Sequence, residues 1–433
     1  MDAPALPVPF KEALRVWLKI GLLGFGGPAG QIALMHRIIV DEKKWVDEER
    51  YLHALNFCML LPGPEAQKLA TYAGWLLHGT RGGLAAGILF VLPGALVMLA
   101  MSLIYVLGQG VPAVEGALFG IKAAVLVIVV EALIRIGRRS LKSALLVGIA
   151  ALAFVGIFFF DLPFPAIVVA AALAGYAFLK NENAASTPPP APGRWRQFGV
   201  ASALGVVLWW APVAIAALAL GGNHVLVDIG VFFSKLAVVS FGGAYALLSY
   251  MAQEAVETHR WMSAPEMVDG LGLAETLPGP LIKITQFVGF LAAYRDAAPF
   301  SPVAAGVLGS VITTWVTFAV PMLLIFAGAP FVEQLRANRR LSGALNAVTA
   351  AVVGVILNLT VWFALHVLFP HVEEARAGPL RWFAFDPLAL NLLAAALAVV
   401  AAVLSFRLHW GLVRMIGAMA ALGVAVTLAP RFL

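Results

Sequence analysis

The sequence predicts an all-α polytopic membrane protein with about 13 transmembrane segments, arranged as two homologous halves. Of the 433 residues, 61% are hydrophobic and only 12% are charged, whereas a soluble domain has roughly a quarter charged residues. Many apolar stretches approach the length of about 20 residues that a helix needs to cross a bilayer. A Leu-Pro-Gly-Pro motif also occurs twice, at residues 61–64 and 277–280.

The duplication extends beyond this motif. The Phe-Gly-Gly of residues 25–27 recurs at 241–243, and Trp45 recurs as Trp261, both at the offset of 216 that relates the two Pro-Gly-Pro motifs. Three landmarks keep one register without a gap. We therefore interpret the chain as a tandem duplication in which Gly and Pro interrupt apolar sequence at the same places in both halves.

The first half is expected over residues 10–180, with about six spans. Residues 10–20 place apolar and charged side chains on opposite faces, which is typical of a helix at the membrane interface. The next two apolar stretches, 20–35 and 51–77, are interrupted by glycine or by Pro62-Gly63-Pro64. Uninterrupted spans follow near 83–107, 112–134, 141–161 and 163–180.

The second half is expected over residues 228–430, again with about six spans. A polar, proline-rich linker at 181–197 and a connecting span at 198–221 precede it. An odd number of crossings then separates the starts of the two halves, so the second half is predicted to be an inverted-topology repeat of the first. Its expected spans lie at 228–252, 265–293, 302–327, 341–369, 386–405 and 408–429.

The basic residues predict the orientation of the chain. With a cytoplasmic N-terminus, more than half of the 29 Lys and Arg residues lie on the cytoplasmic side, as the positive-inside rule requires. The first outside loop, at 37–50, is basic, but its acidic residues offset that charge. The N-terminus shows no removable signal peptide. Cys58 is the only cysteine, which excludes an intrachain disulfide or a Cys-based metal site.

The repeated Gly and Pro breaks predict a transporter's substrate site. A helix broken inside the membrane leaves backbone groups unsatisfied, so such breaks persist only where protein or a water-filled cavity surrounds them. Short, interrupted segments at matching places in two halves are a pointer to the site. The helices expected to start near Glu65 and Leu281 would direct their free N–H groups inward, as an anion site. Pro93, Pro212 and Pro321 are interpreted as ordinary helix kinks.

The candidate residues flank these breaks. Lys68 and Lys283 could add positive charge, or could instead snorkel or pair with a carboxylate; they are not equivalent under the offset, since Gln67 aligns with Lys283. Glu65 and Glu275 are candidates for a proton relay, with pairing to these lysines as the alternative. The predicted substrate-binding residues are Gly26, Gly27, Asn56, Pro62, Gly63, Pro64, Gln67, Lys68, Gly242, Gly243, Pro278, Gly279, Pro280, Lys283, Thr285 and Gln286.

Several other function classes find no support in the sequence. The string at residues 24–29 matches G-x-G-x-x-A, but it follows no strand and lies in a membrane segment, so dinucleotide binding is rejected. We find no Walker A motif, no HExxH motif and no metal spacing among the eight histidines. The net charge of +6 comes mostly from residues that flank apolar segments, which does not indicate nucleic acid. We therefore expect no enzyme activity, metal or cofactor.

These paired motifs, in this order, resemble the chromate ion transporter family, and in particular its long two-domain chromate efflux members. The resemblance covers nearly the whole chain outside the linker. It implies a multi-pass carrier of the bacterial inner membrane that exports chromate and confers chromate resistance, with halves of opposite orientation. A homodimer is one possible assembly.

The mechanism and the substrate leave alternatives open. A dianion leaving a negative interior gains about 2 × 2.3 kcal/mol per 100 mV, so membrane potential, protons or both could drive export. The alternatives are a transporter of sulfate or another tetrahedral oxyanion, and an anion channel built from the same helix N-termini.

Overall fold

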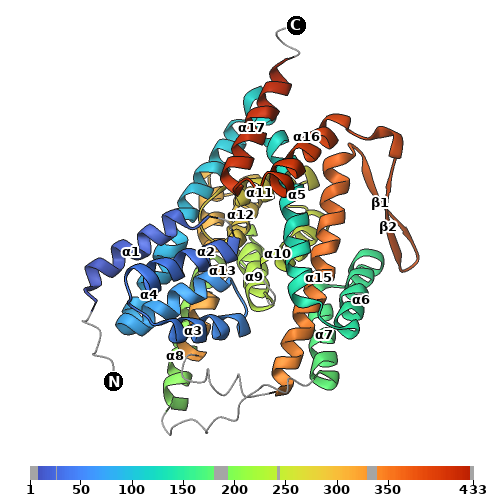
Figure 1. Cartoon of the computed structure of the whole chain (residues 1–433). Coiled ribbons are helices and arrows are strands. Elements are labelled where there is room, and N and C mark those ends of the chain that lie inside the picture. The colour runs from blue at the N-terminus through green and yellow to red at the C-terminus, as the bar shows by residue number, and fades with distance from the viewer. Residues whose placement is uncertain (1–7, 26, 180–193, 241–243, 329–338, 430–433) are drawn as a thin grey trace. The chain divides into compact units, whose positions relative to one another are not determined.

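A computed structural model describes residues 8–25, 27–179, 194–240, 244–328 and 339–429. The chain divides into two compact units: unit 1 comprises residues 1–100, 184–244 and 277–338, and unit 2 comprises 101–183, 245–276 and 339–433. Most of the described residues are helical, so the predicted class is confirmed except for one hairpin (Figure 1). Most of the predicted linker, 181–197, lies outside the described residues.

Unit 1 is built around both interrupted regions of the sequence. Its helices are α1 (Phe10–Leu23), α2 (Gly27–His36), the π-helical turn η1 (Arg37–Glu42), α3 (Glu48–Leu60), most of α4 (Glu65–Leu107), α8 (Arg194–Leu220), α9 (Val225–Val238), the 3₁₀ turn η3 (Leu281–Lys283), α12 (Ile284–Arg295) and α13 (Pro302–Gly328).

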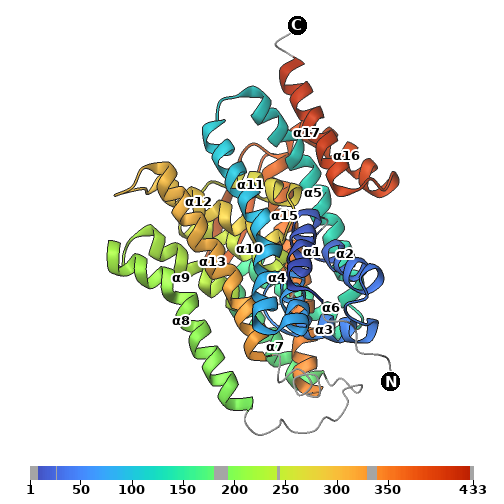
Figure 2. The same cartoon turned by 90° about the vertical axis from the view of Figure 1, so that its left-hand side faces the viewer.

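The long helix α4 consists of two arms. Its backbone leaves helical geometry at His78 and Gly79, where Gly79 has φ +59°. The arms then pack closely, because a Cβ added to Gly74 would lie 2.4 Å from the carbonyl oxygen of Gly82. This turn lies between the two predicted spans 51–77 and 83–107. Elsewhere in unit 1, α13 packs along α8, α9 and α12 (Figure 2).

Unit 2 contains the remaining elements. They are α5 (Pro112–Ser140), α6 (Ala144–Phe160), α7 (Phe164–Phe178), α10 (Ala244–Gln253), the π-helical turn η2 (Glu254–Thr258), α11 (Ala264–Thr276), α15 (Arg339–Leu368), β1 (Val372–Ala377), β2 (Leu380–Phe385), η5 (Pro387–Ala389), α16 (Leu392–Ala402), η6 (Val403–Arg407) and α17 (Leu412–Leu428). Helix α15 lies along α6 and α7, and α17 lies along α5 (Figure 1).

Small residues permit this close packing of apolar helices. A Cβ on Gly120 of α5 would lie 1.9 Å from the carbonyl oxygen of Met419 in α17, so the two backbones touch. Helices in lipid associate through such contacts, because lipid tails provide no hydrophobic force between them.

The strands β1 and β2 correct the all-α prediction. They form an antiparallel hairpin in which Val372 pairs with Phe385 and Ala377 with Leu380. Gly378, at φ +59°, makes the turn. The sequence predicts a loop here, between the expected spans 341–369 and 386–405. Most side chains of the hairpin are at least partly exposed, so no long apolar pattern marked them.

Five helices in the described part of the chain are long and apolar enough to cross a membrane. They are Glu65–Leu107, Pro112–Ser140, Ser202–Leu220, Pro302–Gly328 and Ser342–Leu368, and four shorter apolar helices accompany them. The predicted spans that contain Gly or Pro motifs are instead divided between two helices. The divisions fall where the motifs lie, as the sequence predicted.

Candidate functional site

Both Pro-Gly-Pro motifs interrupt the chain in the same way. Helix α3 ends at Leu60 and α4 begins at Glu65, whereas α11 ends at Thr276 and η3 begins at Leu281. Gly63 has φ +102° and Gly279 has φ +90°, a region that glycine enters without steric strain. The predicted breaks are therefore present. The second differs in one detail, because a 3₁₀ turn delays the start of α12.

Each break is held by the residue that precedes the Phe-Gly-Gly motif of the other half. The N–H of Gly63 donates to the carbonyl of Ser240 at 3.0 Å, and the N–H of Gly279 donates to the carbonyl of Gly24 at 2.9 Å. Ser240 and Gly24 are themselves related by the offset of 216. Gly26, Gly242 and Gly243 lie outside the described residues, but the residues beside them take part in the site.

Helices α4 and α13 form the surfaces against which the two glycines turn. A Cβ on Gly63 would lie 2.5 Å from Cγ of Pro321 in α13. A Cβ on Gly94 of α4 would lie 2.3 Å from the carbonyl oxygen of Pro278. Pro321, predicted to be an ordinary helix kink, lies inside α13, and its ring also packs directly on the first break.

A glutamine after each break donates to the helix that packs on it. Nε2 of Gln67 donates to the carbonyl of Phe318 in α13 at 3.0 Å. Nε2 of Gln286 donates to the carbonyl of Ala95 in α4 at 2.9 Å. Each side chain is buried, so these bonds fix α4 against α13 and α12 against α4 at the breaks.

The two lysines reach equivalent atoms despite their different register. Nζ of Lys68 donates to the carbonyl of Leu61, and Nζ of Lys283 donates to the carbonyls of Leu277 at 3.0 Å and Gly279 at 3.2 Å. Leu61 and Leu277 correspond under the offset of 216. Both lysines are only 1% exposed. The two ammonium groups therefore bind equivalent carbonyls, although the lysines differ in register by one residue.

The lysines therefore supply buried positive charge at both breaks. Carbonyls at the ends of helices carry partial negative charge, and the ammonium groups bind the carbonyls of Leu61 and Leu277. Within the described residues, Lys68 forms no ion pair with Glu65 or another carboxylate, in contrast to the alternative considered from sequence. The Lys68 ammonium group donates to a neutral carbonyl, so it keeps its net charge.

One participant was missed by the sequence analysis. Gln31 of α2 is buried, and its Nε2 donates both to Gly24, at 3.0 Å, and to Gly279, at 2.7 Å. It therefore braces the second break. An isolated glutamine in the apolar stretch 20–35 was the available signal. Its Oε1 is buried without a protein partner, as are those of Gln67 and Gln286, so three acceptors are free for water or for a protonated ligand.

The other predicted site residues are not among those that form the hydrogen bonds named above. The Thr285 hydroxyl donates to the carbonyl of Ile282 at 2.8 Å, so its proton is already used. Gly27, at φ +67°, begins α2 with no atom within 4 Å of where a Cβ would lie. Asn56 is within α3, but its side chain is outside the described part. Glu65 begins α4 and is half-buried, and Glu275 is buried in α11 of unit 2.

Pro62, Pro64 and Pro280 complete the breaks. Pro64 immediately precedes α4, and Pro280 immediately precedes η3, so both prolines set the extended entry to a helix start. Among the residues that the structure describes, no cluster of three His, Cys, Asp or Glu side chains could hold a metal ion.

Comparison with known proteins follows the same division into halves. A family model described as "Chromate transporter" matches residues 11–176 and again residues 227–424. The chain is 35% identical to a chromate transport protein of Pseudomonas aeruginosa, over 82% of this chain and 81% of the relative. It is 26% identical to a chromate transport protein of Cupriavidus metallidurans, over 82% of each chain. It is 27% identical to a probable chromate transport protein of Synechococcus elongatus, over 81% and 84% of the two chains. No solved structure matches.

Proposed function

The chain belongs to the chromate transporter family, and we propose that it is a secondary transporter that exports chromate across the bacterial inner membrane and so confers chromate resistance. One observation carries the proposal. At each helix break a buried lysine binds the carbonyl of the leucine that precedes Pro-Gly-Pro, and the glycine of the motif donates a hydrogen bond to the other half of the chain. We place the N-terminus in the cytoplasm, in accord with the distribution of basic residues.

The charge of the substrate matches the charge of this site. Lys68 and Lys283 provide two buried ammonium groups, and a tetrahedral oxyanion such as chromate carries two negative charges. Two opposite unit charges 4 Å apart attract by about 1 kcal/mol in bulk water, but by about 4 kcal/mol where the effective dielectric constant is 20. In the proposed bound state, the oxyanion accepts hydrogen bonds from these ammonium groups and from backbone N–H groups in the first turn of α4.

The hydrogen bonds that join the two halves at the breaks suit alternating access. We propose that the halves are inverted repeats, as in other transporters with internal repeats and broken helices. The hydrogen bonds from Gly63 to Ser240 and from Gly279 to Gly24 support this arrangement, because each joins one half to the other at related positions. Movement of one half against the other would then change both breaks together. Export of a dianion would be favoured by a potential that is negative inside.

The test is uptake of labelled chromate into energised everted membrane vesicles, with unlabelled sulfate as competitor. We expect saturable accumulation that stops when an uncoupler is added, and a smaller effect of sulfate than of unlabelled chromate. Vesicles that contain the Gly63→Leu variant at equal abundance serve as the control.

Each other outcome excludes the proposal in a different way. Flux that rises linearly with concentration and shows no counterflow would indicate an anion channel. Accumulation in intact cells, with sulfate as the stronger competitor, would indicate a sulfate importer. Absence of chromate movement in either orientation, with the protein correctly inserted, would contradict chromate transport.

A further inference from the structure

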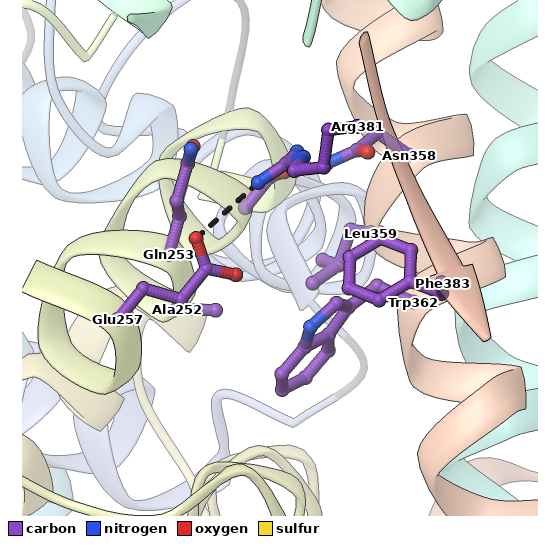
Figure 3. A pocket seen from close by; sticks show the side chains of 9 residues that line it. Ala252, Gln253, Glu257, Asn358, Leu359, Trp362, Arg381 and Phe383 are labelled. Atoms are coloured by element: carbon purple, nitrogen blue, oxygen red, sulfur yellow. Dashed lines mark hydrogen bonds and ion pairs between the residues drawn. The ribbon is translucent and has the colours of Figure 1, made fainter. Parts of the chain in front are cut away.

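Unit 2 contains a polar pocket that takes no part in the site described above. Its walls come from α10, η2, α15 and β2 (Figure 3). The residues that matter here are Gln253 and Glu257 of α10 and η2, Asn358 and Trp362 of α15, and Arg381 and Phe383 of β2. In sequence, Glu257 falls between two predicted spans, 228–252 and 265–293.

A buried guanidinium group lies at the wall of this pocket. The side chain of Arg381 is only 3% exposed, and it donates to the carbonyls of Ile157 at 2.6 Å and Phe158 at 3.2 Å. Its remaining nitrogen, Nη1, faces three carboxylates, with Asp161 at 2.9 Å, Glu257 at 3.3 Å and Glu374 at 3.8 Å. One nitrogen is therefore shared by three acceptors.

The charges of this cluster do not balance. Arg376 provides a second guanidinium group, which contacts Asp161 and Glu374 at 2.5 Å each. Three carboxylates and two guanidinium groups leave one negative charge in excess. Glu257 is the carboxylate that Arg376 does not contact, and within the described residues Arg381 is its only ion-pair partner (Figure 3). A single proton on Glu257 would neutralise the cluster.

The other groups around Glu257 do not provide the missing positive charge. Gln253, one turn earlier, donates to Asp161, and Glu254 of the same turn is itself acidic. On α15, His366 pairs through Nδ1 with the carbonyl of Trp362 at 2.8 Å. Asn358 donates to the Ser249 hydroxyl at 3.0 Å.

An unpartnered acceptor lines the same pocket. Oδ1 of Asn358 is buried and has no protein partner, and the residue is only 8% exposed. A buried acceptor without a partner is rare and requires an explanation. A water molecule in the pocket could donate to it, and such a water is also what delivers a proton to a half-buried carboxylate.

We propose that this pocket is a proton-binding site, in which the Glu257 carboxylate takes up one proton to become a neutral carboxylic acid, and that its occupancy sets the rate of transport. The second clause rests on the transport function proposed above. Burial raises the pKa of Glu257 to about 7, against the opposing effect of Arg381. The carboxyl is therefore protonated below neutral pH and ionised above it.

The position of Glu257 in the chain connects the proton to the transport site. It lies in η2, which leads into α11, and α11 ends at Thr276, directly before the second Pro-Gly-Pro break. Protonation removes the charge–charge attraction between Glu257 of η2 and Arg381 of β2 and leaves at most a weaker hydrogen bond, so the hairpin holds the turn that precedes α11 less strongly. π-Helical turns of this kind are frequent at functional sites.

The first half provides a matched control. The position equivalent to Glu257 under the offset of 216 is Asp41, in the π-helical turn η1. The two turns share their backbone: Lys44 and Arg260 have φ 53° and 52°. The Asp41 side chain is 58% exposed and lies 3.3 Å from His36, whereas that of Glu257 is 26% exposed. Asp41 thus has the same backbone position without the pocket.

The first measurement does not depend on transport. Infrared difference spectra of the purified protein in bilayers, recorded while the pH is varied, should show the C=O band of a carboxylic acid that appears with a midpoint near pH 7. The band should be absent in Glu257→Gln and unchanged in Asp41→Asn. If Glu257→Gln does not fold, Glu257→Asp decides, because it should shift the midpoint. A band that persists in Glu257→Gln, or a midpoint that Glu257→Asp leaves unchanged, overturns the proton site.

The second measurement is the pH profile of chromate flux in proteoliposomes. A single group of pKa 7 changes its protonated fraction by about tenfold between pH 6 and pH 8, and we expect the wild-type rate to follow this change. Glu257→Gln should transport at a rate that varies less than about twofold over this range, and Asp41→Asn should keep the wild-type profile. Flux with an unchanged profile in Glu257→Gln overturns the inference and leaves chromate transport intact. An infrared titration without flux at any pH overturns the proposed function instead.

Discussion

The two Pro-Gly-Pro breaks share one backbone design but differ in how far they are closed. Pro62, Pro64 and Glu65 at the first break are partly exposed, whereas residues 277–280 at the second are all buried. At the first break, Lys68 binds one carbonyl. At the second, Lys283 binds two. The first break is therefore the more open of the two.

A specific side chain accounts for part of this difference. Gln31 donates to the carbonyl of Gly279, but its equivalent under the offset of 216 is Leu247, which has no group that could brace the first break. In the proposed alternating access, each state has one side of the site open and the other shut. Two breaks with the same backbone but different burial fit one such state. The comparison can be tested by changing one break at a time.

The largest effect is expected from a side chain at Gly63. Gly63→Leu should abolish transport, because the left-handed backbone disfavours any side chain and Cβ would overlap the Pro321 ring. Gly279→Ala should be milder, since Cβ there would have nothing closer than 3.6 Å. Strain of the backbone alone contributes about 1–3 kcal/mol at each position. The measurement is chromate uptake at equal protein abundance in the membrane.

A suitable control for that experiment is Gly110→Ala. Gly110 also has a positive φ, +82°, but no atom lies within 4 Å of its Cβ position. Transport by this variant should stay near the wild-type rate. If Gly63→Leu transports normally, or if Gly110→Ala loses as much activity as Gly63→Leu, the first break is not part of the transport site.

The next effect concerns the lysines. Lys68→Met and Lys283→Met should each raise the half-saturation constant for chromate by roughly tenfold, which corresponds to about 1.4 kcal/mol. Each removes one of two buried positive charges while keeping most of the side-chain volume. The exposed Lys235 of α9 offers the control Lys235→Met, which should leave the constant unchanged. A loss of affinity from Lys68→Met alone would show that the two ammonium groups are not functionally equivalent.

The breaks could be predicted from sequence, because Pro and Gly act on their own backbone. Gly63 and Gly279 permit a positive φ whatever surrounds them, and a repeated motif within apolar sequence marks both positions. The contacts that join the halves could not be predicted in the same way. Lys68 and Lys283 differ in register by one residue, and only the path of each side chain shows that they reach equivalent carbonyls.

Long-range partners and exposed elements were also beyond the sequence. Gln31 meets Gly279 across 248 positions, and Pro321 meets Gly63 across a comparable distance, so no local pattern connects them. The hairpin β1–β2 carries Arg381, yet its partly exposed strands lack an apolar period. Glu257 could not be identified from sequence, because it lies in a short charged turn between two predicted spans. Exposed carboxylates are common in such turns, and only the contact with the distant Arg381 distinguishes this one.

The smallest effect should come from Gln31→Leu, which places in the first half the leucine that the second half has at the equivalent position, Leu247. The change removes two hydrogen bonds, while the carbonyl of Gly24 keeps the N–H of Gly279 as a donor and that of Gly279 keeps Lys283, so the loss is about 0.5–1.5 kcal/mol per bond. We expect the N–H of Gly279 to exchange faster with deuterium and the unfolding temperature to fall by a few degrees. Gln109→Leu, at an exposed turn, should change neither quantity. If exchange at Gly279 is unaffected by Gln31→Leu, this side chain does not close the second break, and the unequal burial of the two motifs must come from the packing of α4 and α12 alone.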